Sequence, residues 1–348
     1  MRRCWPLRRS SSSADQDSAW NRFVHQELKG YSPIMTGNRV LAFFLVATVL
    51  LIPLGAAILA ASLSVTEYKI RYDNVGTGFD SSDKSVQQQA LWAGAGNQST
   101  VTFTTTKRLK APVYLYYELQ RYYQNHKRYV RSLNSNQLGG KYEAPGSLGT
   151  CAPQQYASDS ADGTPVPPNT EINPCGLMPY SYFNDSFSLQ GFTLDDSNIA
   201  WKSDRNSLYG DYAPSFFNQV PRSRGGGAIQ GNVSHDQHFL VWMRPGAART
   251  VRKLYARINE DIPAGTPLTL TVSNQYNTYG YGGSKWVILT TNSWVGGHNN
   301  ALGGIMVTIG SLAFLTAVIF FCSYHLNKKR RGYADPNYLS WNRTSLVH

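Results

Sequence analysis

Residues 40–63 read VLAFFLVATVLLIPLGAAILAASL, and residues 301–324 read ALGGIMVTIGSLAFLTAVIFFCSY, two apolar runs without a charged side chain. Each run is longer than the roughly 20 residues with which a helix crosses a hydrocarbon core of about 30 Å. Buried core helices are commonly shorter and carry a polar stripe. We therefore predict transmembrane helices at 40–63 and 301–326, with a folded domain at 64–300.

A cleaved signal peptide is the alternative interpretation of the first run, because Leu59-Ala60-Ala61-Ser62 places small residues at its end. A signal peptide has an apolar region of roughly 7 to 15 residues behind a short basic segment. The run at 40–63 is longer than that region, and residues 1–39 are too long for the basic segment. The pattern favours a retained span.

The net charge of +12 is concentrated in the two tails. Residues 1–39 hold seven Lys and Arg against three acids, and residues 327–348 hold five against one. Such a distribution argues against a basic nucleic-acid face on the folded domain. Because basic flanks stay on the cytosolic side, we predict two cytosolic tails and an exoplasmic or lumenal domain. We expect this membrane to be that of the endoplasmic reticulum, the Golgi or endosomes, or the plasma membrane.

The domain at 64–300 has the pattern of a mainly β structure. Alternating residues predict strands at 101–104, 268–272 and 285–289, and continuous apolar runs favour buried strands at 113–119 and 238–243. Short helices are expected at 122–133 and 248–258. Since both ends of the domain enter the membrane, an antiparallel sandwich is the simplest closure. The expected fold is therefore a mainly β, antiparallel sandwich-like ectodomain with short helices on two transmembrane α-helices.

Four apolar residues ahead of the first span recur at helical spacing: Trp20, Phe23, Val24 and Leu28. Arg22 and Gln26 lie between them and Lys29 follows, which is typical of a helix in the headgroup layer, with membrane lipids as its partner. A disordered tail with scattered apolar residues explains the same pattern, so both interpretations stay open.

Residues for catalysis are not grouped along the chain. No GxxxxGK[ST], GxSxG or HExxH motif occurs, and the DKTG motif through which P-type pumps form an aspartyl phosphate is missing. His235 and His238 lack a third metal ligand, so we expect no metal site and no cofactor. A carboxylate pair for sugar chemistry is the remaining enzymatic alternative, and its candidates are Asp185, Asp195, Asp196 and Asp211.

The predicted location of the domain determines its modifications. Asn97, Asn184 and Asn232 fit the N-x-[ST] rule inside the domain and are expected to carry glycans, whereas Asn342 in the cytosolic tail is not. Cys4 lies in a tail and Cys322 in a span, so Cys151 and Cys175 are the two cysteines in the oxidising compartment. One disulfide between them is expected.

Several long blocks carry a family resemblance: 122–132 (YYQNHKRYVRS), 173–186 (NPCGLMPYSYFNDS), 199–204 (IAWKSD), 238–258 (HFLVWMRPGAARTVRKLYARI) and 288–304 (ILTTNSWVGGHNNALGG). With them the chain resembles the accessory β-subunits of type IV P-type ATPases, the lipid flippases. The resemblance implies a heterodimer with the pump, contact with its extracytoplasmic loops, and support of its export from the endoplasmic reticulum and its phosphoenzyme cycle. It also implies a Cys151–Cys175 bridge. Many members carry an extra cysteine cluster that residues 64–150 lack.

The same blocks supply candidate contacts with the partner. Asn125, His126 and Arg128 form a polar run, for which a solvated helix start is the alternative. Trp201, Lys202, Trp242 and Arg244 combine aromatic bodies with charge, as interface cores do, although core packing of both tryptophans fits equally. Trp294 is expected to anchor at the membrane interface, and Pro53, Gly55, Gly303 and Gly310 are candidates for packing against a partner span.

These observations predict a non-catalytic flippase subunit that supports phospholipid translocation to the cytosolic leaflet. A stand-alone two-span receptor or adhesion ectodomain is the alternative.

Overall fold

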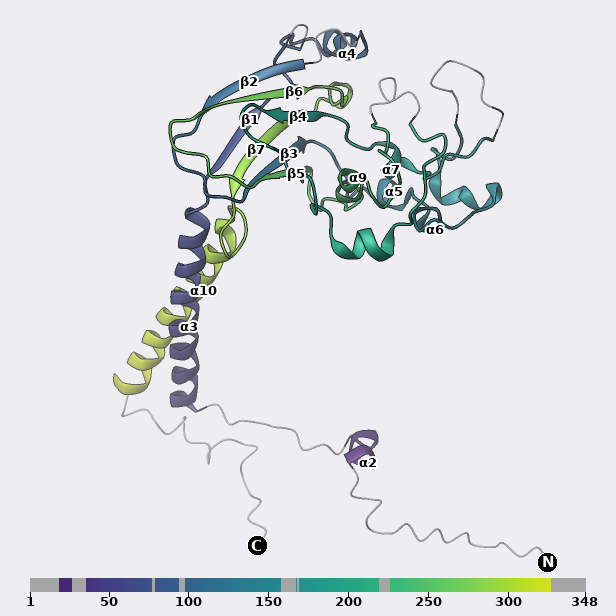
Figure 1. The fold of residues 1–348 in the computed structure, drawn as a ribbon. Helices are drawn as coiled ribbons and strands as arrows, with labels where there is room; N and C mark the ends of the chain where they lie inside the picture. The colour runs from purple at the N-terminus through teal and green to yellow at the C-terminus, as the bar shows by residue number, and fades with distance from the viewer. Residues whose placement is uncertain are drawn as a thin grey trace, which may run out of the picture. The chain divides into compact units, whose positions relative to one another are not determined.

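The structure is a computed structural model that describes residues 19–26, 36–76, 79–93, 98–157, 167, 169–218 and 226–326. The chain divides into two compact units, one made of Met1–Ala56 with Gly304–His348 and the other of Ala57–Gly303. Figure 1 shows the helices of the first unit and the strands and short helices of the second.

Two long helices make up most of the described part of the first unit and continue into the second. They are α3 (Gly37–Leu63) and α10 (Asn300–Leu326), and both are long and apolar enough to cross a membrane. The two predicted helices are therefore confirmed at nearly the expected bounds. The short helix α2 (Ala19–Val24) precedes them and exposes Trp20, Phe23 and Val24, whereas Leu28 lies outside the described residues.

Two glycines let α3 and α10 approach each other closely. A Cβ on Gly55 would lie 2.9 Å from both Met306 Cβ and the backbone nitrogen of Val307. A Cβ on Gly310 would lie 2.7 Å from Ile52 Cγ1. Gly55 and Gly310 therefore allow close contact between the chain's own two helices, whereas the sequence had suggested contact with a helix of a partner.

The second unit contains two antiparallel sheets, which lie one above the other in Figure 1. The first has the order β1 (Glu67–Arg71), β7 (Ser284–Thr291), β3 (Val113–Gln120), β5 (Thr250–Ile258). The second has the order β2 (Gln98–Thr104), β6 (Pro267–Ser273), β4 (Ser186–Leu189). One apolar core contains residues of both sheets, including Leu115, Val251 and Val287 from the first and Leu270 and Phe187 from the second. The sandwich-like prediction is confirmed.

Short helices and turns complete this unit. They are α4 (Lys84–Ala93), α5 (Lys127–Arg131), α6 (Ser135–Leu138), η1 (Pro145–Cys151), α7 (Leu177–Tyr180), η2 (Asp204–Leu208), α9 (Gln237–Trp242) and η3 (Tyr279–Tyr281). Most of them, α5 to α9, gather beside the sandwich (Figure 1). The disulfide between Cys151 and Cys175 lies in this region with both cysteines fully buried, so the predicted bridge is present.

The strands expected at 101–104, 113–119, 268–272 and 285–289 all form, but two other assignments are wrong. The apolar run 238–243 is the helix α9 rather than a strand, because Asp236 caps it by accepting a hydrogen bond from the Phe239 nitrogen at 2.9 Å. Residues 248–258 contain the strand β5 rather than a helix. The β5 strand pairs along the whole length of β3 and buries Val251, Ala256 and Ile258 in the core, which outweighs local helix propensity. Of the helix expected at 122–133, only α5 forms.

Candidate functional site

An exposed tryptophan and an arginine form a fixed pair on the surface of the second unit. Trp201 precedes η2 and is 65% exposed, and the Arg244 guanidinium carbon, just after α9, lies 4.1 Å from its ring centroid. Asp204 holds this guanidinium with two hydrogen bonds, from Nε at 2.8 Å and from Nη2 at 2.5 Å. The carboxylate is almost fully buried, and it raises the pKa of Arg244. A planar cation therefore stays stacked on the indole ring.

The pair borders a cleft of about 430 Å³ that continues over the middle of β3 and β5. Its wall includes Tyr116, Leu254, Arg252 and Lys253. Burial lowers the pKa of Lys253 to about 8, with charge repulsion from Arg244 as the second cause. The Lys253 ammonium donates a hydrogen bond to the Arg244 carbonyl. The cleft thus combines apolar walls with several cationic groups.

Residues of the block 122–132 form hydrogen bonds with the turn that follows Arg244. Gln124 Oε1 accepts a hydrogen bond from the Gly246 nitrogen at 2.8 Å, and Asn125 Nδ2 donates to the Ala247 carbonyl at 2.8 Å. His126 and Arg128 follow on the surface, as does Lys202 beside Trp201. We call these exposed residues the Trp201 surface: Asn125, His126, Arg128, Trp201, Lys202 and Arg244. Six of the eight predicted contacts belong to it.

The other two predicted contact residues lie elsewhere. Trp242 is fully buried in the core and donates its indole N–H to the Met178 carbonyl at 2.9 Å, so it is not a surface contact residue. A strand at 238–243 would have placed its side chains alternately on two faces. In the helix α9, Trp242 lies on the inner side instead, which explains why the prediction for Trp242 is wrong. Trp294 is 74% exposed in the turn between β7 and α10. Ser62 accepts a hydrogen bond from the Asn299 nitrogen at 2.8 Å and donates to Asn300 at 2.7 Å, which fixes the start of α10.

Of the other two span candidates, Pro53 is exposed inside α3, and Gly303 is buried at the outer end of α10. Pro53 therefore remains open to lipid or a partner helix, whereas Gly303 does not.

In the described part of the chain, the four candidate aspartates Asp185, Asp195, Asp196 and Asp211 each contact other residues. Asp185 is fully buried and forms an ion pair with Lys285 Nζ at 2.7 Å, where it also accepts the Tyr72 hydroxyl at 2.7 Å. Burial lowers the pKa of Lys285, and Asp185 opposes this change. The network joins β7 to the segment ahead of β4 and serves the core.

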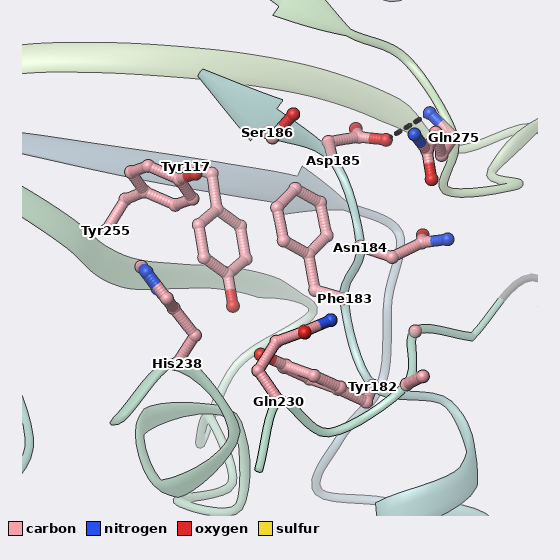
Figure 2. A pocket seen from close by; sticks show the side chains of 12 residues that line it. Tyr117, Tyr182, Phe183, Asn184, Asp185, Ser186, Gln230, His238, Tyr255 and Gln275 are labelled. Atoms are coloured by element: carbon pink, nitrogen blue, oxygen red, sulfur yellow. Dashed lines mark hydrogen bonds between the residues drawn. The ribbon is translucent and has the colours of Figure 1, made fainter. Parts of the chain in front are cut away.

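A second hollow, of about 350 Å³, borders Asp185 and is lined by five ring-bearing residues together with polar and small ones (Figure 2). Tyr117 and Phe183 stack there at 3.8 Å, and the His238 imidazole lies 4.5 Å from the Tyr255 ring. His238 also contacts Asp196 at 3.3 Å, whereas His235 lies near Asp211. Among the residues that the structure describes, no three metal-ligating side chains come together.

The sequons differ in their surroundings. Asn184 is one of the residues that line the hollow beside Asp185 (Figure 2), and both atoms of its carboxamide are buried without a hydrogen-bond partner in the described part of the chain. A glycan there requires the side chain to turn outward. Asn232 is partly exposed and donates a hydrogen bond to Asp211 at 2.5 Å. Asn97 lies outside the described residues.

Sequence reasoning missed the roles of Asp204 and Lys253. Asp204 stands three residues after Trp201 in the block IAWKSD, but its partner Arg244 is 40 residues away, so local spacing carried no signal for the pair. In the sequence Lys253 looks like an ordinary surface lysine, and only the structure shows that it is a buried position of β5.

Comparisons with known proteins extend over nearly the whole chain. Residues 58–331 match the family described as "LEM3 (ligand-effect modulator 3) family / CDC50 family". The chain is 38% identical over 341 residues to "Putative ALA-interacting subunit 4" of Arabidopsis thaliana, covering 94% of this chain and 95% of the relative. It is 36% identical over 345 residues to "ALA-interacting subunit 3" of the same plant, covering 96% and 94%. It is 28% identical over 387 aligned positions to "Phospholipid-transporting ATPase accessory subunit LEM3" of Saccharomyces cerevisiae, covering 97% and 89%.

Proposed function

Because the chain belongs to the CDC50/LEM3 family, we propose that it is the non-catalytic accessory subunit of a type IV P-type ATPase that moves phospholipid. The yeast relative is named as an accessory subunit of a phospholipid-transporting ATPase, and two plant relatives are named as interacting subunits. A subunit of this kind acts on lipid asymmetry by binding the pump and changing the stability or populations of its states.

The Trp201 surface is the observation that supports a docking role most directly. Exposed tryptophan and arginine are the residue types that dominate binding energy in protein interfaces. Asp204 already fixes Arg244 against the ring at 4.1 Å, so little side-chain freedom is lost on binding. We therefore place the extracytoplasmic loops of the pump on the Trp201 surface.

The proposed topology puts both tails in the cytosol and the unit Ala57–Gly303 on the exoplasmic or lumenal side. The basic flanks of the two apolar helices support this orientation. It also predicts glycan addition at Asn97, Asn184 and Asn232 and not at Asn342. Endoglycosidase treatment of sequon variants tests it, and a glycan on Asn342 would reverse the orientation.

The second part of the proposal is support of pump export from the endoplasmic reticulum. Its experiment is affinity capture of the full chain from solubilised membranes with identification of the partners, combined with localisation of the pump after deletion of the chain. We expect a type IV ATPase among the captured proteins and its retention in the endoplasmic reticulum. Capture of no P-type ATPase, with unchanged pump location, would favour the stand-alone receptor instead.

A further inference from the structure

A large hollow with hydroxyl-bearing and basic side chains in its wall lies at the end of the second unit from which both apolar helices leave. Its volume is about 690 Å³, and its wall includes Ser64, Thr66, Arg108, Lys110 and Ser293. Ser64 directly follows the last residue of α3, and Ser293 precedes α10 by seven residues. The hollow and the outer turns of both helices belong to the same compact unit, Ala57–Gly303.

The length of the helices places this hollow at the level of lipid headgroups. Each has 27 residues, which gives about 40 Å at 1.5 Å per residue. The hydrocarbon core is about 30 Å thick, and the bilayer with its headgroups about 40–45 Å. The ends of these helices therefore reach the polar layer. Trp294, next to Ser293 and 74% exposed, suits the same layer.

The hollow has an excess of positive charge. Arg108 and Lys110 line it, Lys107 lies on the same short segment, and Asp261 is the acidic neighbour of Arg108 and Lys110. Asp261 accepts from Arg108 Nη2 at 2.5 Å and from the Ala111 nitrogen at 2.7 Å, which offsets one of the three charges. Within the part of the chain that the structure describes, no hydrogen bond to the Lys110 ammonium is formed.

The basic segment is held in place by its backbone. Leu109 exchanges two hydrogen bonds of 2.9 Å with Ile262, and its side chain is fully buried. The Tyr68 hydroxyl accepts from the backbone nitrogens of Thr106 and Lys107 at 2.7 and 3.0 Å. Arg108 and Lys110 therefore line the hollow from a fixed segment rather than from a free tail.

We propose that this hollow binds the phosphate group of a phospholipid in the outer leaflet. Phosphate matches the unpaired positive charge, and the hydroxyl-bearing wall suits a headgroup rather than an acyl chain. The position beside both helix ends selects a membrane lipid over a free phosphate ion. The site gives the chain a lipid contact of its own, which goes beyond a docking role and holds with or without a pump.

The experiment titrates the purified full-length chain in detergent with dioleoylphosphatidylserine and follows the bound lipid by native mass spectrometry. Lys110→Gln removes one positive charge and should weaken binding about fivefold. Lys110→Glu changes the charge by two units and should weaken it about 25-fold. Lys141→Glu, at an exposed lysine on the turn after α6, is the matched control and should bind like the unaltered chain.

Two further probes identify the source of the phosphate. Dioleoylglycerol, which lacks phosphate, should not bind at this site, and inorganic phosphate at millimolar concentration should not displace the lipid. Equal binding by Lys110→Glu and the unaltered chain would overturn the proposal, as would binding of dioleoylglycerol. Displacement by inorganic phosphate would make this a site for the free ion. Unchanged lipid binding by Lys110→Glu together with lost pump capture would make it a protein contact.

Discussion

Replacement of Trp201 by alanine should weaken binding of the pump without unfolding the chain. The side chain is 65% exposed, and a fully buried tryptophan covers up to about 250 Å², so roughly 160 Å² remains for a partner to cover. At about 25 cal/mol per Å² this area contributes about 4 kcal/mol if it is covered completely. Coverage of half the ring leaves about 2 kcal/mol. We therefore expect Trp201→Ala to raise the Kd roughly 30-fold to 1,000-fold.

The assay is titration of the fluorescently labelled full chain against a solubilised type IV ATPase. Trp92→Ala is the matched control, because Trp92 on α4 is also half exposed but lies outside the Trp201 surface. The thermal midpoint of both variants should stay close to that of the unaltered chain, since neither side chain belongs to the main core. A Kd for Trp201→Ala within twofold of the unaltered value would refute the docking surface. Equal weakening by the two variants would do the same.

Three further predictions concern stability. Cys151→Ala with Cys175→Ala opens a loop of 24 residues' separation and should cost about 3.5 kcal/mol, a lowering of the thermal midpoint by roughly 7–14 °C in calorimetry; a shift under 2 °C would contradict this. Because the pKa of Lys253 is about 8 when folded and about 10.5 when unfolded, the unfolded chain binds more protons between these values, and the free energy of unfolding should rise from pH 8 to 10. This rise in the free energy of unfolding should be lost in Lys253→Met. An identical pH profile for the variant and the unaltered chain would show that Lys253 is not its cause. Gly55→Leu should separate α3 from α10 and lower resistance to proteolysis in detergent, whereas Gly304→Ala, with open space around it, should not; equal resistance of the two variants would rule out the close approach.

The features that depend on local sequence could be predicted. The two apolar helices follow from uninterrupted runs of 24 residues, and the strands at 101–104 and 285–289 follow from their alternation. The Cys151–Cys175 bridge followed from the predicted compartment and from the small number of cysteines. In each of these cases a local feature of the sequence was consistent with a single structure.

The wrong assignments share a cause, which is that tertiary contacts decide between two local possibilities. The run HFLVWM at 238–243 suits a buried strand and a buried helix equally, and the Asp236 cap selects the helix. Residues 250–258 have helix-compatible side chains, but pairing with β3 selects the strand. The ion pair Arg244–Asp204 and its stacking on Trp201 join two distant blocks, and only the fold shows that they meet.

The most direct test of the proposed function reconstitutes three preparations in liposomes: the chain alone, its captured type IV ATPase alone, and the two together. Uptake of a fluorescent phospholipid and hydrolysis of ATP are measured on each. We predict no lipid movement and no hydrolysis by the chain alone, and higher rates for the pair than for the pump alone. Lipid movement by the chain alone, or pump rates that do not change when the chain is added, would contradict the role of a non-catalytic accessory subunit.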